Sequence, residues 1–163
     1  DMEGVPKRRV DLVREGVIGT PVVDKLYSDR LGVPLTGSAA SLGSDDHGTA
    51  LHLSMAGGDS TREELIASTA RGIWVTRFNY LNGLLDPKAA LMTGMTRDGT
   101  FLIEDGRVTK RLPNLRWTQS IVDAFRRVDG LTRERRIVGA WWNVVGGVIA
   151  PTVRIRNWNF GGS

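Results

Sequence analysis

The sequence contains no cysteine and only two histidines among its 163 residues. The absence of cysteine excludes disulfides, thiolate metal ligands and cysteine nucleophiles. His47 and His52 are separated by residues that carry neither a helix signal nor a glutamate, so they lack the pattern of a zinc-binding helix. Asp45 and Asp46 lie nearby, in a loop rich in small polar residues. We therefore expect no metal site in this chain, with a diverged zinc site on His47 or His52 as the alternative.

No arrangement of residues for catalysis is recognisable either. A catalytic serine needs a base that a third group positions, whereas Ser38, Ser41 and Ser44 lie near His47 in a loop without such a frame. The glycine pairs of the chain lack the lysine and the spacing of a phosphate-binding loop. The sequence thus predicts no catalytic residue.

Long apolar runs are also missing. The longest one, residues 137–150, is interrupted by Asn143 and by glycines, and it is shorter than the roughly 20 apolar residues of a membrane span. We expect a buried strand here and no membrane contact. No basic and apolar leader opens the chain, and its first residues resemble the interior of a longer protein.

The composition is that of a globular domain, with 40% hydrophobic and 25% charged residues. The length suits a single domain over residues 1–163. The net charge is +4, but the basic residues are scattered over many segments instead of lining one element beside aromatic residues. This pattern indicates a solvated surface and does not favour a nucleic-acid partner.

Glycine-containing turns predict antiparallel strands. Glu15-Gly16 joins two apolar stretches, Val5–Val13 and Val17–Leu26, in the manner of a hairpin. Asp98-Gly99 and Asp105-Gly106 supply the positive φ angles of type I′ turns. We therefore expect a three-stranded meander made of residues 91–97, 100–104 and 107–112.

Two helices are predicted. Ser60 and Glu63 have the spacing of a capping box, and Gly72 marks the end of the first helix. The second helix spans Thr118–Val128, with Thr118 as its cap. Residues 27–58 read mainly as a surface loop, and further strands are expected at residues 51–55, 73–80, 141–145 and 152–160. The fold class is α+β, predominantly antiparallel β, in which meander hairpins form a curved or barrel-like sheet with about two helices.

Two segments carry polar groups that strand or helix formation does not require. Arg77, Asn79 and Tyr80 interrupt a strand that is otherwise built for burial. Asn114 and Arg116 lie in a turn that leads into the predicted second helix. Turns and strand edges of this kind often receive a ligand or a partner subunit, so these five residues are the predicted peptide- or partner-binding site.

Many segments, in order and through nearly the whole chain, resemble the TldD/PmbA family, also called modulators of DNA gyrase. The resemblance rests on the following segments: Glu3-Gly4-Val5-Pro6, Gly16-Val17-Ile18, residues 25–32 with Thr36-Gly37, Gly57-Gly58, residues 63–66, residues 72–78, Asp86-Pro87, residues 98–106 and residues 150–155. It implies the β-rich C-terminal domain of a longer protein whose N-terminal part is absent here. It also implies a cytoplasmic peptidase in which two related subunits, TldD and TldE (PmbA), form a heterodimer that degrades extended peptides, matures peptide antibiotics and removes an antitoxin.

In that family only the TldD branch carries zinc, on a histidine helix upstream and a cysteine in the C-terminal domain. The region expected to hold that cysteine, Val128 to Pro151, is present and contains none. The segments 77–80 and 114–120 further resemble the TldE-like type. The resemblance therefore implies a non-zinc subunit that binds peptide, docks a zinc-bearing TldD-like partner and is inactive alone. The alternative is a standalone peptide- or DNA-binding module.

Overall fold

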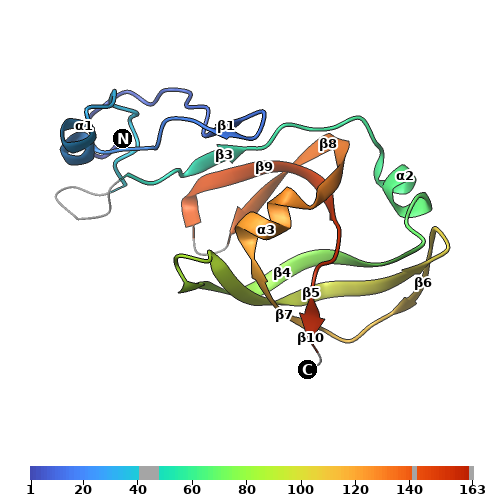
Figure 1. Ribbon diagram of the computed structural model, residues 1–163. Helices are drawn as coiled ribbons and strands as arrows, with labels where there is room; N and C mark the ends of the chain where they lie inside the picture. The colour runs from blue at the N-terminus through green and yellow to red at the C-terminus, as the bar shows by residue number, and fades with distance from the viewer. Residues whose placement is uncertain (41–47, 141–142, 162–163) are drawn as a thin grey trace. The chain divides into compact units, whose positions relative to one another are not determined.

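A computed structural model describes residues 1–40, 48–140 and 143–161 (Figure 1). The described chain forms two compact units. Unit 1 contains residues 1–54 and 137–149, and unit 2 contains residues 55–136 and 150–163. His47, and Trp141 and Trp142 of one predicted strand, lie outside the described residues.

Unit 2 is built on a five-stranded antiparallel sheet, whose long hairpin of β4 and β5 is visibly curved in Figure 1. The strand order is β10-β7-β5-β4, and β6 pairs with β5 next to β7. The predicted predominance of antiparallel strands and the curvature are confirmed, whereas the sheet does not close into a barrel. The strands are β4 (Arg71–Asp86), β5 (Leu91–Glu104), β6 (Arg107–Arg111), β7 (Arg116–Ser120) and β10 (Phe160–Gly161).

One of the two predicted Asp-Gly turns is wrong. Asp105 and Gly106 do form the β5–β6 turn, with φ angles of 47° and 74°. Asp98, however, lies inside β5, where its φ of 65° belongs to a bulge: the pairing with β4 shifts register between Val75 and Arg77. Thr76 Oγ1 donates to the carbonyl oxygens on both sides of this bulge, Arg97 O at 3.0 Å or Gly99 O at 3.1 Å. An Asp-Gly pair thus forms a bulge within β5 at residues 98–99 and the turn between β5 and β6 at residues 105–106.

Both predicted helices exist, but they are shorter. Helix α2 spans Arg62–Ala67, and its capping box joins Thr61 with Glu64, one residue later than the predicted pair. Helix α3 spans Ile121–Arg126 with Ser120 as N-cap, because Thr118 is instead paired in β7. Gly72 belongs to β4, so it does not end the first helix.

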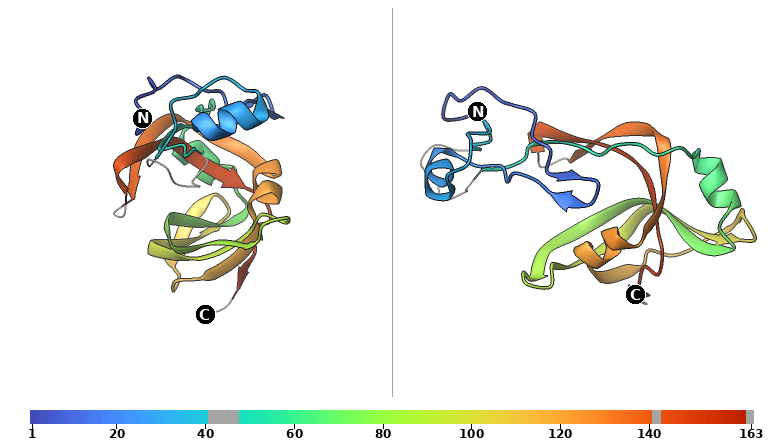
Figure 2. Two further views of the ribbon diagram at one scale, coloured as in Figure 1. Left: turned by 90° about the vertical axis from the view of Figure 1, so that its left-hand side faces the viewer. Right: turned by 45° about the horizontal axis from the view of Figure 1, so that its top comes forward.

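The β5–β6 turn holds the C-terminal end of α2. The N–H of Asp105 donates to Ala70 O at 2.8 Å, and that of Gly106 to Thr69 O at 3.0 Å. A Cβ on Gly106 would lie 2.5 Å from Ala67 O, so only glycine permits this approach. Figures 1 and 2 show the turn beside the helix.

Unit 1 contains the predicted hairpin around Glu15-Gly16, reduced to strands β1 (Val13–Arg14) and β2 (Val17–Ile18). Helix α1 (Lys25–Leu31) was not predicted. The sequence predicted the end of an apolar hairpin strand at Leu26 and a loop from residue 27. Asp24 caps this helix by accepting from the N–H of Tyr27, and Gly32 ends it at a φ of 63°. The sequence does contain the capping residues of this helix. With only two turns, however, the helix is too short to show a clear periodicity of apolar residues.

The strand predicted at residues 51–55 is present as β3 (His52–Ser54). The strands predicted at 141–145 and 152–160 fall largely in one strand, β9 (Asn143–Ile155), which ends before the predicted last strand does. Most of β8 (Val128–Ala140) was not predicted, because its charged residues were interpreted as a turn. β3 pairs with β9 in parallel, an exception to the antiparallel pattern. The expectation of burial for the apolar stretch 137–150 is wrong at Ile137 and Val138, which are 79% and 54% exposed. Within the described ranges, no helix is long and apolar enough to cross a membrane.

The core of unit 2 combines apolar side chains with paired hydroxyl groups. Trp117 is 2% exposed and Ala124 1%. Thr96 and Thr100 are fully buried, and the hydroxyl of Thr100 donates to Thr96 Oγ1, which also accepts from the N–H of Leu115. These bonds tie β5 to the segment before β7, since every buried polar group needs a partner.

Candidate functional site

Unit 2 has a groove of about 980 Å³ that runs along the outer edge of β4. One wall is continuous chain, residues 68–78, and residues 152–158 form another. Consecutive residues of β4 point to opposite faces of the sheet. A wall that includes every residue from 71 to 78 therefore follows the edge of the strand. β4 is the last strand of the sheet, so within the described chain this edge has no strand partner. Helices α2 and α3 contribute Leu65, Ile66 and Phe125.

An aromatic cluster lines the inner end of the groove. The ring of Phe78 stacks on that of Trp158 at 5.3 Å between centroids, and the ring of Trp117 lies 5.0 Å from both. Phe160 adjoins Trp158 at 6.5 Å. Since the rings pack mainly against one another, the cluster forms an apolar wall.

Two polar groups of this cluster lack partners. The indole N–H groups of Trp117 and Trp158 are buried and make no hydrogen bond. A buried donor left without an acceptor costs about 1–3 kcal/mol. Such groups are rare in folded proteins, and they mark places where an acceptor can be added.

Arginines surround the groove. Arg62 lies over the ring of Trp74 at 5.3 Å and pairs with Glu63, while Arg71 has no ion-pair partner within the described residues. Five arginines line the groove, and three carboxylates pair with them: Arg62, Arg71, Arg77, Arg154 and Arg156, with Glu63, Asp98 and Asp129. Five positive against three negative charges leave an excess of two positive charges.

Asp129 is the only carboxylate in the lining itself. It pairs with Arg154 at 2.8 Å and also with Arg156. Burial raises the pKa of Asp129, but the hydrogen bonds and positive charges of the two arginines outweigh it, and the pKa lies below its usual value. Asp129 therefore stays ionised and holds both guanidinium groups at the groove.

The five residues predicted as a site are only partly brought together. Asn79 pairs with Met95 and Met95 with Arg116, so Asn79 and Arg116 lie in one row across β4, β5 and β7. Arg116 contacts the sulfur of Met95 at 3.9 Å. This row lies on the sheet face opposite Phe78 and Trp117, because neighbouring residues alternate.

The remaining predicted residues are dispersed. Arg77 reaches the groove at the strand edge and pairs with Asp98 at 2.6 Å. Tyr80 projects from β4 with 71% of its surface exposed and a φ of 52°. Asn114 is exposed in the segment between β6 and β7. Two residues of the groove, Trp117 and Trp158, were not predicted. Trp117 could have been found, because it directly follows the predicted residue Arg116.

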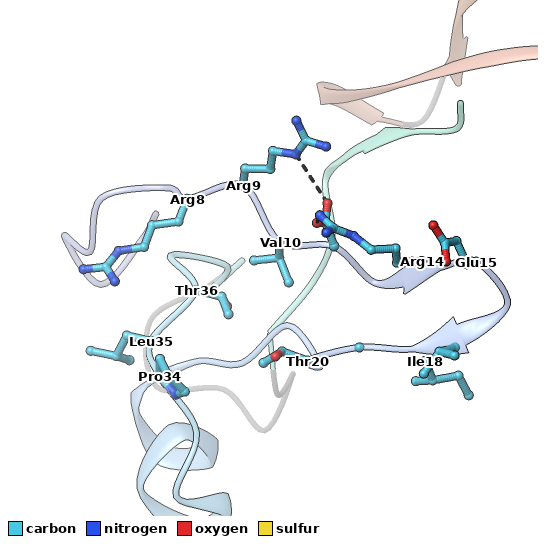
Figure 3. A pocket seen from close by; sticks show the side chains of 13 residues that line it. Arg8, Arg9, Val10, Arg14, Glu15, Ile18, Thr20, Pro34, Leu35 and Thr36 are labelled. Atoms are coloured by element: carbon cyan, nitrogen blue, oxygen red, sulfur yellow. Dashed lines mark hydrogen bonds and ion pairs between the residues drawn. The ribbon is translucent and has the colours of Figure 1, made fainter. Parts of the chain in front are cut away.

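Unit 1 has a second, open cleft of about 740 Å³ beside the β1–β2 hairpin (Figure 3). Arg9 and Arg14 both pair with Asp11, whereas Arg8 points away from Arg9. The hydrogen bond and charge of Arg14 lower the pKa of Asp11, with a smaller contribution from Arg9. Ile18 is 85% exposed at the rim. The internal pairing of these charges leaves little for a ligand to recognise.

The residues that the structure describes include no group that fits a zinc site. The sequence has no cysteine, and the described residues contain no group of three or more histidine, aspartate or glutamate side chains that could hold a metal. His52 is exposed on β3. His47, with Asp45 and Asp46 beside it, lies outside the described residues.

The fold is a curved antiparallel sheet with short helices. The sequence matches, over residues 1–162, a model for the C-terminal domain of metallopeptidases. The chain belongs to that family, the PmbA/TldA metallopeptidase C-terminal domain family, as the resemblance of its segments predicts. Among curated proteins, none matches the sequence.

Three solved structures are similar to the chain. TldE from Thermococcus kodakarensis is 20% identical with a TM-score of 0.79, over 98% of this chain and 35% of that one. A candidate modulator of DNA gyrase from Thermotoga maritima is 19% identical with a TM-score of 0.72, over 94% and 33%. Another from Bacteroides thetaiotaomicron is 23% identical with a TM-score of 0.66, over 100% and 32%. These likenesses establish the fold, and the chain spans about a third of the length of each structure.

Proposed function

We propose that the chain is the β-rich domain of a zinc-free, TldE-like subunit, which binds extended peptide and docks a zinc-bearing TldD-like subunit in the cytoplasm. The groove along the unpaired edge of β4 carries this proposal. An extended peptide can pair with such an edge through main-chain hydrogen bonds, which give affinity with little sequence preference. The absence of cysteine, and of a metal-binding group among the described residues, supports leaving zinc and hydrolysis to the partner.

The end of the β4–β5 hairpin is the proposed docking surface. Tyr80, Leu81 and Leu85 are 71%, 47% and 53% exposed there. Large apolar and aromatic side chains form the buried centres of protein interfaces. Tyr80 is also one of the residues that the sequence predicts to contact a partner.

The test compares the chain alone with the chain mixed with a zinc-bearing subunit of the family. Alone, it should bind no zinc and cleave no casein-derived peptide. Together, the two should form a complex whose cleavage stops when a chelator is added. Leu85→Ser should weaken the complex, whereas Val108→Ser on β6, which removes a side chain of similar exposure (42%), should not.

Stoichiometric zinc with chelator-sensitive cleavage by the chain alone would contradict the proposal. DNA binding that weakens steeply with salt, in the absence of any complex with the zinc subunit, would favour the standalone module instead.

A further inference from the structure

The charge and the wall structure of the unit 2 groove restrict what it can bind. Its lining arginines exceed the carboxylates that pair with them by two, and Arg71 at the start of β4 has no ion-pair partner in the described chain. A ligand with negative charges is therefore attracted, and one with positive charges repelled.

The buried side-chain groups of the groove that lack a partner are hydrogen-bond donors. Trp117, 2% exposed, and Trp158 both present buried N–H groups without partners. Trp158 belongs to the short segment between β9 and β10, so a displacement of its ring would open both donors to a ligand. A carbonyl or carboxylate oxygen would then gain hydrogen bonds from donors that have already lost their water.

The aromatic rings distinguish a peptide from a single-stranded nucleic acid. Nucleic-acid sites stack bases on free ring faces. Here Phe78, Trp117 and Trp158 pack against one another at 5.0–5.3 Å, which leaves apolar walls but few free faces. The unpaired edge of β4 beside them offers main-chain N–H and C=O groups, which an extended peptide matches and a nucleic acid does not.

We propose that the groove binds acidic peptide segments, which add to the β4 edge as a strand, place an apolar side chain against the aromatic cluster and direct carboxylates to Arg71 and Arg156. This inference rests on the proposed peptide-binding function and adds the location and the charge preference of the site. The segment is that of a peptide substrate, and binding of a segment of the partner subunit is measured separately.

The experiment titrates the full chain with a short blocked peptide that has a central phenylalanine flanked by glutamates. Tryptophan fluorescence and calorimetry report binding, since three of the five tryptophans line the groove. The same peptide with lysine in place of glutamate should bind at least about tenfold more weakly, and added salt should weaken the glutamate peptide. A version with methylated main-chain nitrogens should lose most of its affinity, because it cannot pair with β4.

Variants locate the site. Arg71→Gln should weaken the glutamate peptide about threefold to fivefold, the size expected for one exposed charge. Arg107→Gln, an exposed arginine on β6 outside the groove, is the matched control and should leave binding unchanged. Trp158→Ala should reduce the fluorescence response and weaken binding, because Trp74 and Trp117 still line the groove.

Equal affinity for the glutamate and lysine peptides, equal effects of Arg71→Gln and Arg107→Gln, or no binding would each overturn the inference. So would displacement of the peptide by a single-stranded oligonucleotide at lower concentration, or self-association of the chain that Arg71→Gln abolishes. Capture of the zinc subunit is measured separately. Peptide binding without capture supports the groove and contradicts the docking role, and capture without peptide binding does the reverse.

Discussion

The carboxylate of Asp129 on β8 lies 2.8 Å from Nε of Arg154 on β9, and the same guanidinium reaches α2 through Nη1, which lies 3.2 Å from Leu65 O and 2.8 Å from Ser68 Oγ. Both side chains are sheltered, with 21% and 27% exposure. One arginine thus joins a helix and two strands around the groove.

Asp129→Asn should destabilise the protein by about 1–2 kcal/mol, because two guanidinium groups lose their shared carboxylate. The control is Asp11→Asn, which also removes a carboxylate from two arginines but at an exposed position. Its effect should be clearly smaller, because water screens the charge of an exposed group. Chemical denaturation of both variants measures the difference, and equal losses would contradict the special role of Asp129.

The same carboxylate should make stability depend on acid. Its pKa is lowered in the folded protein, so its contribution is fully present above the ordinary value of 3.8 and is lost as the pH falls through the lower folded value. Unfolding free energies measured between about pH 5 and pH 2 should therefore fall less steeply for Asp129→Asn than for the unchanged protein. Parallel curves would refute the linkage.

Thr61→Ala should cost about 1 kcal/mol, because the hydroxyl of Thr61 accepts from the N–H of Glu64 and closes the capping box of α2. Ser60→Ala is the control: it removes a hydroxyl one residue earlier, where the sequence predicts the cap. A larger loss for Ser60→Ala in urea denaturation would place the helix start at the predicted residue instead.

Trp117→Ala should destabilise unit 2 by about 3–5 kcal/mol, since it leaves a cavity between Phe78 and Trp158. Val108→Ala, at an exposed position of β6, should cost less than about 0.5 kcal/mol. Near-ultraviolet circular dichroism should show the loss of aromatic packing in the first variant alone. A small loss for Trp117→Ala would mean that the cluster is not a core.

The bulge at Asp98 can be tested by its backbone angle. Asp98→Gly should change stability by less than about 1 kcal/mol, because glycine accepts the positive φ and only exposed ion pairs with Arg77 and Arg97 are lost. Asp98→Val should cost about 1–2 kcal/mol more, since a β-branched residue is strained at that angle. Equal stability of the two variants would argue against a bulge.

Turn chemistry and strand composition predicted most of the sheet of unit 2, because both are local properties. Asp98-Gly99 shows where local information ends: the pair permits a reversal or a bulge, and the pairing with Thr76 and its neighbours on β4 selects the bulge. Capping was misplaced by one residue at Thr61 for a related reason, since two adjacent hydroxyl residues are equally able to cap a helix.

The candidate site was harder to predict than the fold. Arg77 was identified because it is polar in an apolar strand, and it does reach the groove. Trp117 and Trp158 are 41 positions apart, and neither is unusual in its own segment, so only the folded chain shows that they meet. Arg154 looked like an ordinary exposed residue of an alternating strand, although its bonds to Asp129 and Leu65 O give it a structural role.

A helix of six residues has too few internal bonds to persist by itself in water. The two amides of the Asp105-Gly106 turn hold the chain at the far end of α2, so the helix depends on the pairing of β5 with β6. Arg62 and Leu65 of α2 line the groove. We therefore expect a lengthened loop at Gly106 to disorder this side of the groove while the sheet stays intact.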